Sequence, residues 1–338
     1  MAELKRSLRI ILQTVAEGFW LPKGYGNFIL SSCSALVKSD RNLGMPVHLT
    51  IEPTNVCNLR CSVCETGSGI LRRPKGSMLL DDFKTVIDKM KCTNTLFFYF
   101  MGEPFLNKDA YEMIRYAEDK NIFVSACTNG QNVDAKSLIK SGIGEINFQI
   151  GGVTQEMHEK YRVRGNLKRT MDNLVDTLER NEISGNKIKV VVGFIVMKHN
   201  AHEVDYFIEL AKKLGFEAQL INPCVRTLEQ GKELLPRDLK YWIYDHEAFN
   251  RGILRPKTVP RNHCEWIYYS TVVLWNGDVV PCCRDAQGEY VMGNVLKQDF
   301  EEIWNGEKYR NFRKSIRENQ SDMKLCRLCS GYGMPMLK

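Results

Sequence analysis

Three cysteines within eight residues restrict this chain more than any other sequence feature. Cys57, Cys61 and Cys64 follow a short strand-like stretch at a C-x3-C-x2-C spacing. Thiolates at this spacing can bind one side of an iron–sulfur cube while one iron keeps no protein ligand. Structural zinc normally takes four ligands, and buried cysteines can fall at such a spacing by chance. The motif therefore favours an iron–sulfur cluster with an open iron over either alternative.

The same eight residues resemble the signature of the radical S-adenosylmethionine (SAM) enzymes. In that family SAM chelates the open iron, and its reductive cleavage yields a 5′-deoxyadenosyl radical that removes a hydrogen atom from the substrate. The resemblance therefore implies that Cys57, Cys61 and Cys64 hold a SAM-binding [4Fe-4S] cluster. The family usually has an aromatic residue before the third cysteine, and here it is Val63, a change near the adenine that leaves the ligands intact.

Length and charge narrow the possible classes of protein. The chain has 338 residues, enough for a large core in one or two domains. Its 47 Lys and Arg residues against 40 Asp and Glu residues give a net charge of +7, but they form no long basic block. This distribution predicts anionic ligands, so we expect no nucleic-acid partner. No stretch reaches the ~18 apolar residues of a membrane span.

The twelve cysteines indicate metal binding in a reducing compartment. They occur in short-spaced groups, and the apolar run Ile10 to Leu12 is interrupted too early for a signal peptide. Cysteines grouped in this way, without a secretory signal, favour metal ligation over disulfides. We therefore expect a cytoplasmic protein.

Strand and helix signals alternate from Val47 to Ile221. Strands are expected over residues 47–51, 95–100, 122–128, 145–150, 187–196 and 218–221, and helices over 80–90, 108–120, 134–141, 167–181 and 203–214. Six strands alternating with helices predict an α/β fold whose parallel sheet binds ligands at the carboxyl ends of its strands. The family resemblance narrows this prediction to a partial (β/α)6 barrel of the radical SAM type over residues 46–225.

Two further regions flank the expected barrel. Residues 1–45 predict two helices with a Pro/Gly break at 21–26, and their apolar residues cover a barrel end or contact a lipid-like substrate or membrane surface. Residues 226–338 predict a connection with a helix over 238–249, followed by a small β-hairpin and helix module. Asn276-Gly277 is a two-residue hairpin signal, and short helices are expected over 300–304 and 307–319.

Polar residues after the expected strands resemble the SAM-binding positions of the family. Gly102-Glu103-Pro104 is similar to the family's Gly-Gly-Glu loop, with Met101 in place of the first glycine, and its carboxylate would hold the amino group of SAM. After the fourth strand Gln149 stands where relatives commonly have Ser. The resemblance implies a SAM site formed by Gly102, Glu103, Thr128, Asn129, Gln149, Arg162, Arg164 and Asn200.

Cys224 follows the sixth expected strand, where a barrel thiol would face the substrate. Free cysteines are usually small core residues, but a thiol at this position could return a hydrogen atom to a substrate radical. We therefore take Cys224 as the candidate catalytic residue.

A second group of four cysteines surrounds the expected hairpin. Cys264 precedes it, Cys282 ends it, and Cys326 and Cys329 follow two short helices in a C-x2-C pair. This C-x12-G-x4-C and C-x2-C arrangement resembles the SPASM auxiliary-cluster module in its shortened twitch form, which implies one auxiliary [4Fe-4S] cluster. Cys283 could replace its neighbour Cys282 as a ligand, and a zinc ribbon would use the same four thiols.

The resemblance covers residues 46–338 and implies a radical SAM oxidoreductase. Enzymes with one auxiliary cluster and this spacing look like inosamine dehydrogenases, so we expect oxidation of a C–H site in a sugar, polyol or other small natural product. The implied partners are a small-molecule or peptide substrate and an electron donor such as flavodoxin or ferredoxin. Epimerisation and peptide modification are the enzymatic alternatives, and a zinc-stabilised nucleic-acid-binding protein is the non-enzymatic one.

Overall fold

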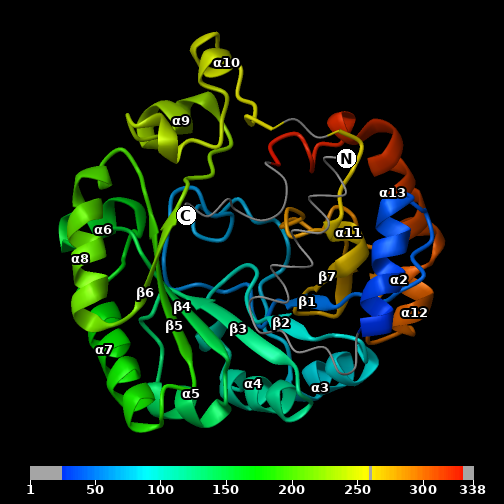
Figure 1. Ribbon diagram of the computed structural model, residues 1–338, viewed down its shortest axis with the longest axis horizontal. Coiled ribbons are helices and arrows are strands. Elements are labelled where there is room, and N and C mark those ends of the chain that lie inside the picture. The colour runs from blue at the N-terminus through cyan, green and yellow to red at the C-terminus, as the bar shows by residue number, and fades with distance from the viewer. Residues whose placement is uncertain (1–24, 259–260, 330–338) are drawn as a thin grey trace.

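Six parallel strands form the centre of the computed structural model, which describes residues 25–258 and 261–329 (Figure 1). They are β1 (His48–Ile51), β2 (Thr95–Phe97), β3 (Phe123–Thr128), β4 (Glu145–Ile150), β5 (Lys189–Ile195) and β6 (Glu217–Ile221). Each pairs in parallel with the next along the chain. The predicted α/β fold with a parallel sheet is therefore confirmed.

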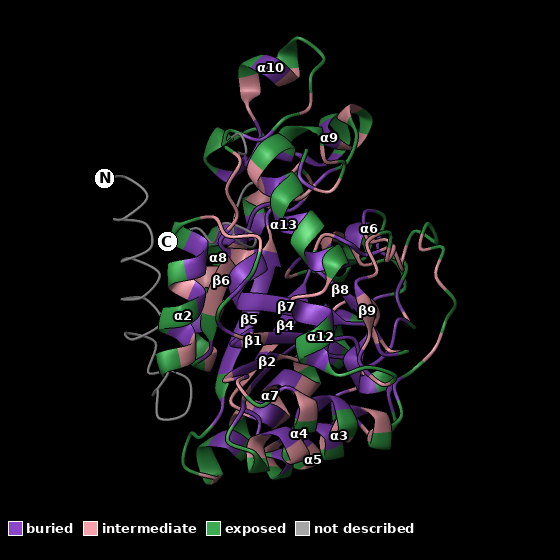
Figure 2. Cartoon of the chain, turned by 90° about the vertical axis from the view of Figure 1, so that its right-hand side faces the viewer, coloured by how far each residue is buried: buried purple, intermediate pink, exposed green. Residues whose placement is uncertain are grey.

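Amphipathic helices cover the outer side of the curved sheet (Figure 1). They are α3 (Leu80–Lys89), α4 (Ala110–Asp119), α5 (Ala135–Ser141), α7 (Leu167–Ile183) and α8 (Val204–Leu214), all near their predicted positions. Strands β1, β3, β4 and β5 are mostly buried, whereas the outer helix faces are exposed (Figure 2). Helix α3 shows the pattern, because Phe83, Val86 and Ile87 are buried while its acidic first turn faces solvent. The main core lies between sheet and helices.

The C-terminal hairpin extends the same sheet. Strand β7 (Ser270–Val273) pairs in parallel with β1, so that Thr50 lies opposite Val272. Strands β8 (Asp278–Val280) and β9 (Gly293–Asn294) then add in antiparallel orientation, giving a sheet order of β6-β5-β4-β3-β2-β1-β7-β8-β9 among the described residues. The predicted hairpin is present, and it is joined to the barrel through β1.

The turn of this hairpin differs from the two-residue loop that its sequence predicts. Val273 pairs with Val279, and the Leu274 N–H donates to the Asp278 carbonyl at 2.9 Å. The loop therefore contains three residues, Trp275 to Gly277. Gly277 adopts a φ of 84°, the left-handed conformation that glycine tolerates in a three-residue hairpin.

The connection after β6 contains short helices in place of the single helix predicted over 238–249. They are α9 (Leu228–Leu234), which was not predicted, the 3-10 turn Leu239–Tyr241, and α10 (His246–Asn250). Asp238 and Asp245 each accept a backbone N–H at the start of their own segment. Two N-caps in one window start two short helices, so the prediction of one long helix was wrong.

The remaining helices lie at the two flanks. Helix α6 (Gln155–Tyr161) was not predicted, whereas α12 (Phe300–Trp304) and α13 (Glu307–Asn319) were. Helix α2 (Tyr25–Leu36) packs on α11 (Trp266–Tyr269), where the rings of Phe28 and Tyr269 stack at 5.2 Å between centroids. Short 3-10 turns span Pro104–Leu106, Ala201–Glu203 and Gln320–Asp322. The helix predicted before residue 21 lies outside the described residues.

Candidate iron–sulfur and SAM site

The first cysteine loop leaves the carboxyl end of β1. Cys61 is buried, and Cys57 and Cys64 are half-buried. The Cys64 N–H donates to the Cys61 carbonyl at 3.3 Å, and the Leu59 N–H donates to the Cys57 sulfur at 3.4 Å. Gly67 closes the loop, because a Cβ there would lie 2.5 Å from the Cys61 nitrogen. Local backbone contacts therefore gather the three thiols.

The surroundings of these thiols favour binding to the positively charged iron–sulfur core of a cluster. Burial, with smaller contributions from Glu103, Cys61 and Cys64, raises the pKa of Cys57 to about 12. Burial also raises the pKa of Cys61, which the Arg162 guanidinium opposes. Thiolates that are costly to form alone are stabilised by bound iron, and their protons leave when the metal binds. These mutual effects show that the three thiols are close neighbours.

Within the described ranges, no group of three or more His, Cys, Asp or Glu side chains is arranged to hold a single metal ion. An iron–sulfur cluster requires a different arrangement of ligands from a single metal ion, because each thiolate binds a separate iron.

The Gly-Glu turn after β2 is fixed against the start of the cysteine loop. Gly102 has a φ of 86°, and a Cβ on it would lie 2.4 Å from the Thr54 carbonyl oxygen. The Glu103 N–H donates to the Val56 carbonyl at 2.9 Å. No larger residue fits at position 102 without moving this backbone, so the turn places the carboxylate beside the cysteines.

The Glu103 carboxylate is buried and already accepts hydrogen bonds. Only 2% of the residue is exposed. The Thr128 hydroxyl donates to one oxygen at 2.6 Å and the Asn129 N–H to the other at 2.8 Å. Burial raises the pKa of Glu103 to about 7, although these hydrogen bonds lower it. An ammonium group beside it would stabilise the ionised form, as the predicted role in SAM binding requires.

Asn129 joins this carboxylate to the cysteine loop. Its side-chain amide donates to the side-chain Oδ1 of Asn58 at 2.8 Å, and Asn58 lies between the first two cysteines in sequence. Thr128, Asn129 and Glu103 thus form one hydrogen-bonded group with the loop, as their predicted common site demands.

Gln149 and Arg162 form a second polar group near the same loop. Arg162 donates to the Gln149 side-chain oxygen at 3.4 Å, and its guanidinium also hydrogen bonds the Cys61 thiol. Its Nε is buried and has no partner among the described residues. A buried donor without an acceptor is costly, so this guanidinium is available for an anion such as the carboxylate of SAM.

The other two predicted SAM residues are placed differently. Arg164 is exposed in a left-handed turn, with a φ of 70°, and no described contact joins it to the other site residues. The buried Asn200 amide donates to the carbonyls of Gly151 and Ile195 at 2.8 and 2.9 Å, and its oxygen accepts the Met197 N–H. Its side chain therefore links the ends of β4 and β5.

Polar residues inside the barrel were missed from the sequence. The Asn147 amide donates to the Gln219 oxygen at 2.8 Å and its own oxygen accepts from Gln149 at 2.7 Å. Cys127 on β3 lies beside Arg162 and Gln149. The signal was present, because Glu145, Asn147 and Gln149 alternate along β4 with apolar residues that face the helices.

The second cysteine group is brought together from three segments. Cys264 precedes α11, Cys282 follows β8, and Cys326 and Cys329 follow α13. Burial, with smaller contributions from the thiols of Cys329 and Cys326, raises the pKa of Cys264 to about 12. Cys264 similarly raises the pKa of Cys282, after the larger effects of Cys283 and burial. The four predicted ligands are therefore neighbours, as one auxiliary cluster requires.

The neighbouring thiols of Cys282 and Cys283 interact with each other, but they differ in their other neighbours. Burial raises the pKa of Tyr99, at the end of β2, and the thiols of Cys127 and Cys283 add to the rise. Cys283 is exposed and affects Tyr99, whereas Cys282 is half-buried and is affected by Cys264. This placement favours Cys282 as the ligand of the two.

A buried ion pair links the two cysteine groups. Glu52 directly follows β1 and has no exposed surface, and Arg73 contacts both of its carboxylate oxygens at 2.9 and 2.6 Å. Arg73 also donates to the Ala286 carbonyl at 2.7 Å, and the Trp275 N–H donates to Glu52 at 3.3 Å. One bidentate pair therefore holds the first loop and the C-terminal module against each other.

Cys224 lies between the two groups. Burial raises its pKa, whereas a hydrogen bond with Arg284 lowers it, and Cys329 is near enough to affect it. Cys224 in turn affects Tyr161, together with Cys61 and Cys64. The candidate catalytic thiol thus faces the space between both sets of cysteines.

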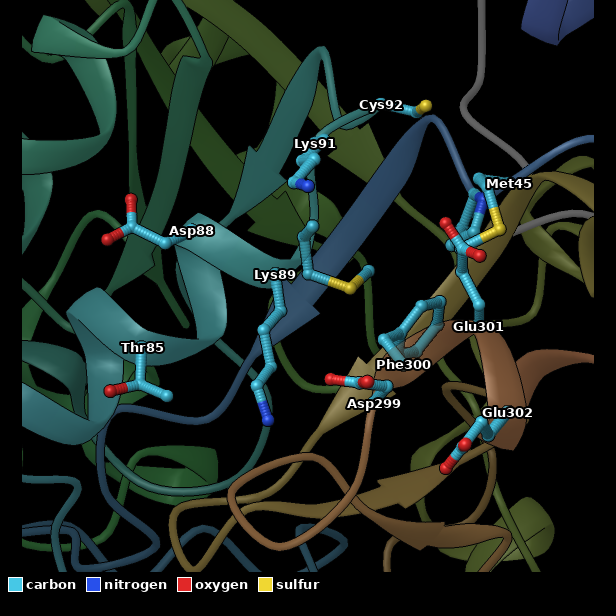
Figure 3. Close-up of a pocket in the computed structure, with 12 residues that line it drawn as sticks. Met45, Thr85, Asp88, Lys89, Lys91, Cys92, Asp299, Phe300, Glu301 and Glu302 are labelled. Atoms are coloured by element: carbon cyan, nitrogen blue, oxygen red, sulfur yellow. The ribbon is translucent and has the colours of Figure 1, made fainter.

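A separate cavity of about 720 Å³ opens at the amino ends of β1 and β2 (Figure 3). Lys89, Cys92, Phe300 and Glu301 line it, with other residues of the same segments. Cys57, Cys61, Cys64, Gly102 and Glu103 follow the opposite, carboxyl ends of these strands. In the part of the chain that the structure describes, no helix is long and apolar enough to span a membrane.

Fold and site together define the class of protein. The radical SAM superfamily model matches residues 51–211, and the SPASM model, an iron–sulfur cluster-binding domain, matches residues 264–330. The chain belongs to the radical SAM superfamily and carries a SPASM-type module. Its cofactors are therefore SAM and a SAM-binding [4Fe-4S] cluster, and the SPASM-type module binds auxiliary iron–sulfur.

Known proteins resemble the chain over most of its length. The mycofactocin maturase MftC of Mycobacterium tuberculosis is 25% identical over 315 residues, covering 87% of this chain and 78% of MftC. Streptococcus suis SuiB, solved with its precursor peptide SuiA, has a TM-score of 0.64 and 14% identity, covering 89% and 74% of the two chains. BtrN, solved with AdoMet and 2-DOIA, has a TM-score of 0.53 and 19% identity, covering 86% and 95%. The two structural likenesses show the fold.

Proposed function

We propose that this radical SAM enzyme oxidises a C–H site in a sugar, polyol or other small natural product, and that the C-terminal cysteines hold the electron acceptor. The observation that carries the proposal is that Cys224 has neighbours near both cysteine groups. Tyr161 is near Cys61, Cys64 and Cys224, and Cys224 is near Cys329. A substrate beside Cys224 is next to both groups.

Cys57, Cys61 and Cys64 would hold the SAM-binding cluster, and Cys264, Cys282, Cys326 and Cys329 the auxiliary one. When bound, these groups would supply a hydrogen-atom acceptor derived from SAM and a one-electron acceptor, while the remaining proton would leave to solvent. The protein's own residues position these partners. Glu103 would hold the amino group of SAM, and Arg162 its carboxylate, by charge-assisted hydrogen bonds. Asn129 would keep Glu103 in register with the cysteine loop through Asn58.

Peptide modification is the second candidate function. A specific observation favours it, because MftC is named as a maturase and SuiB was solved with a precursor peptide. The same cofactors and the same two-electron balance serve a peptide C–H site. An electron donor such as flavodoxin or ferredoxin stays a prediction for either substrate.

The test compares wild-type protein with the double variant Cys326→Ala/Cys329→Ala, both reconstituted anaerobically. We expect about eight irons in the wild type and about four in the variant, which should still cleave SAM but form no oxidised product. Assays offer sugars, polyols and peptides separately. Normal product formation by a soluble variant that has lost half its iron would reject the auxiliary acceptor.

Cys224→Ala is the companion variant. A dehydrogenase should keep forming product, because the substrate electron leaves through the C-terminal cluster. An epimerase that uses this thiol should instead stop after hydrogen abstraction, and that result would replace oxidation by epimerisation.

A further inference from the structure

We propose that helix α2, the segment that follows it and the exposed side of α13 form a surface that binds an anionic phospholipid membrane. Figure 1 places α2 and α13 on the same flank of the molecule. The surface combines a stripe of exposed aliphatic side chains with a basic cavity. None of its residues belongs to the cysteine groups or to the SAM site, so the inference is independent of the reaction proposed above.

One face of α2 presents apolar side chains to solvent (Figure 2). Ile29, Leu30, Leu36 and the following Val37 are between 44% and 74% exposed. A period of 3.6 residues per turn places these positions on one side of the helix. Leu43, a few residues further on, is 64% exposed. Among the described residues, five of the fourteen exposed large apolar side chains therefore fall within residues 29–43, which makes them one patch.

The backbone under this patch is held in place by tertiary contacts. On one side of Leu43, the Asn42 side-chain amide donates to the Tyr268 carbonyl at 2.8 Å. On the other side, the Trp304 indole N–H donates to the Gly44 carbonyl at 2.8 Å. Burying a leucine is favourable, but a segment fixed at both neighbours cannot turn Leu43 inward. The fold itself therefore keeps this apolar side chain at the surface.

A cavity of about 550 Å³ opens between residues 39–41, which lie between Val37 and Leu43 in the chain, and α13. The charged residues that line it are four basic and two acidic ones: Arg41, Arg310, Lys314, Arg317, Asp40 and Glu307. Arg317 pairs with Asp40 at 2.9 Å. In the described ranges, Arg41, Arg310 and Lys314 form no ion pair, and only Glu307 remains to oppose them. The cavity is therefore positively charged and open to an anion.

Charge distinguishes among the occupants that this surface could take. Residues 1–24 carry four basic and two acidic side chains, so they supply no countercharge for the cavity. A second copy related by a two-fold axis would place the same basic surface against itself, which is unfavourable. The occupant that complements both the stripe and the cavity is therefore a partner with apolar and anionic parts.

A phospholipid bilayer matches this description better than an acidic protein does. Its acyl region accepts the aliphatic stripe, and its phosphates accept hydrogen bonds from Arg310 and Lys314. The centres of protein interfaces are enriched in aromatic residues, whereas the large exposed side chains of residues 29–43 are all aliphatic. An apolar helix face with basic residues at its edge is the arrangement of helices that lie in the plane of a membrane surface.

Vesicle binding by the reconstituted full-length holoenzyme tests the surface. Flotation is measured with vesicles of phosphatidylglycerol and phosphatidylcholine in equal amounts, and with phosphatidylcholine alone. The variants that change the surface are Arg310→Gln/Lys314→Gln and Val37→Gln/Leu43→Gln. The matched controls change exposed residues elsewhere on the chain, and they are Lys212→Gln/Lys213→Gln and Ile183→Gln/Ile253→Gln. Iron content, SAM cleavage and circular dichroism establish that each variant is folded.

We expect the wild type and both controls to bind the anionic vesicles equally, and to bind phosphatidylcholine more weakly. Arg310→Gln/Lys314→Gln should bind the anionic vesicles about 25-fold more weakly, because each cation contributes about fivefold near an anionic surface. Added salt should weaken binding of the wild type for the same reason. Val37→Gln/Leu43→Gln should lose about tenfold, because less apolar surface enters the bilayer.

Absence of vesicle binding by the wild type, or equal losses in the surface and control variants, would overturn the membrane surface. Three further results would reject it in favour of another occupant. A wild-type dimer that Val37→Gln/Leu43→Gln dissociates would assign the face to a second copy. Binding of glycerol 3-phosphate without vesicles would assign the cavity to a free phosphate. Binding of polyglutamate without vesicles would assign the surface to an acidic protein.

Discussion

The two cysteine groups of this protein are built in opposite ways. Cys57, Cys61 and Cys64 sit in one loop whose shape depends on adjacent backbone bonds and on Gly67. The C-terminal four come from three segments, and Cys264 and Cys282 depend on the pairing of β7 with β1 and β8. The first loop should therefore keep its backbone conformation when its thiols are replaced. The C-terminal site, by contrast, forms only when the surrounding module is folded, so the stability of the site and of the module are coupled.

Removing the local ligands should have the largest effect on activity. The triple variant Cys57→Ala/Cys61→Ala/Cys64→Ala should lower 5′-deoxyadenosine formation to background, because the site that reduces SAM is lost. Its melting temperature without metal should stay close to that of wild-type protein, since the loop contacts are made by backbone atoms. SAM cleavage at the wild-type rate, measured by chromatography, would contradict the assignment of this loop.

Breaking the link between the two groups should have the largest effect on stability. Glu52→Gln removes one partner of the buried pair with Arg73 and should lower the free energy of unfolding by about 3–5 kcal/mol. The matched control is Glu156→Gln, whose partner Lys160 is an exposed neighbour on α6, and this change should leave the free energy of unfolding almost unchanged. Urea unfolding measures both. Equal costs would show that the cysteine groups are held together by other contacts.

The smallest expected effect is that of replacing Glu103, which belongs only to the site of the first cysteine loop. Glu103→Gln should weaken SAM binding by roughly 1.5–3 kcal/mol, because a charge-assisted hydrogen bond is lost. Since the pKa of Glu103 is raised to about 7, the carboxylate ionises between pH 6 and 8, and SAM affinity of the wild type should rise about tenfold over that range.

The stability of the free protein should respond to pH with the opposite sign. Between pH 4.5 and 7 the folded state holds a proton on Glu103 that the unfolded state has lost, so this group's contribution to stability falls as pH rises. Calorimetric titration at several pH values checks the affinity, with Glu118→Gln as a control away from the cysteines. A pH-independent affinity in the wild type would remove Glu103 from the SAM site.

Predictions from the sequence succeeded where the signal was local. Amphipathic periodicity placed α3, α4, α7 and α8 and the six parallel strands, and Asn276-Gly277 placed the hairpin. They failed where short segments depend on capping: α6 and α9 were missed, and two N-caps were taken for one helix over 238–249. Short helices gain most of their stability from tertiary packing, so their own sequence carries little periodic signal.

The sequence by itself determined the identity of the first cysteine loop and the residues that follow each strand, because their spacing is contiguous in the chain. Only the tertiary structure decided that β7 lies beside β1, that Arg73 reaches Glu52, and that Arg284 contacts Cys224. These contacts join residues that are far apart in the chain. Bringing such residues together costs conformational entropy, and packing of the whole sheet offsets this cost. A local sequence pattern therefore does not predict these contacts.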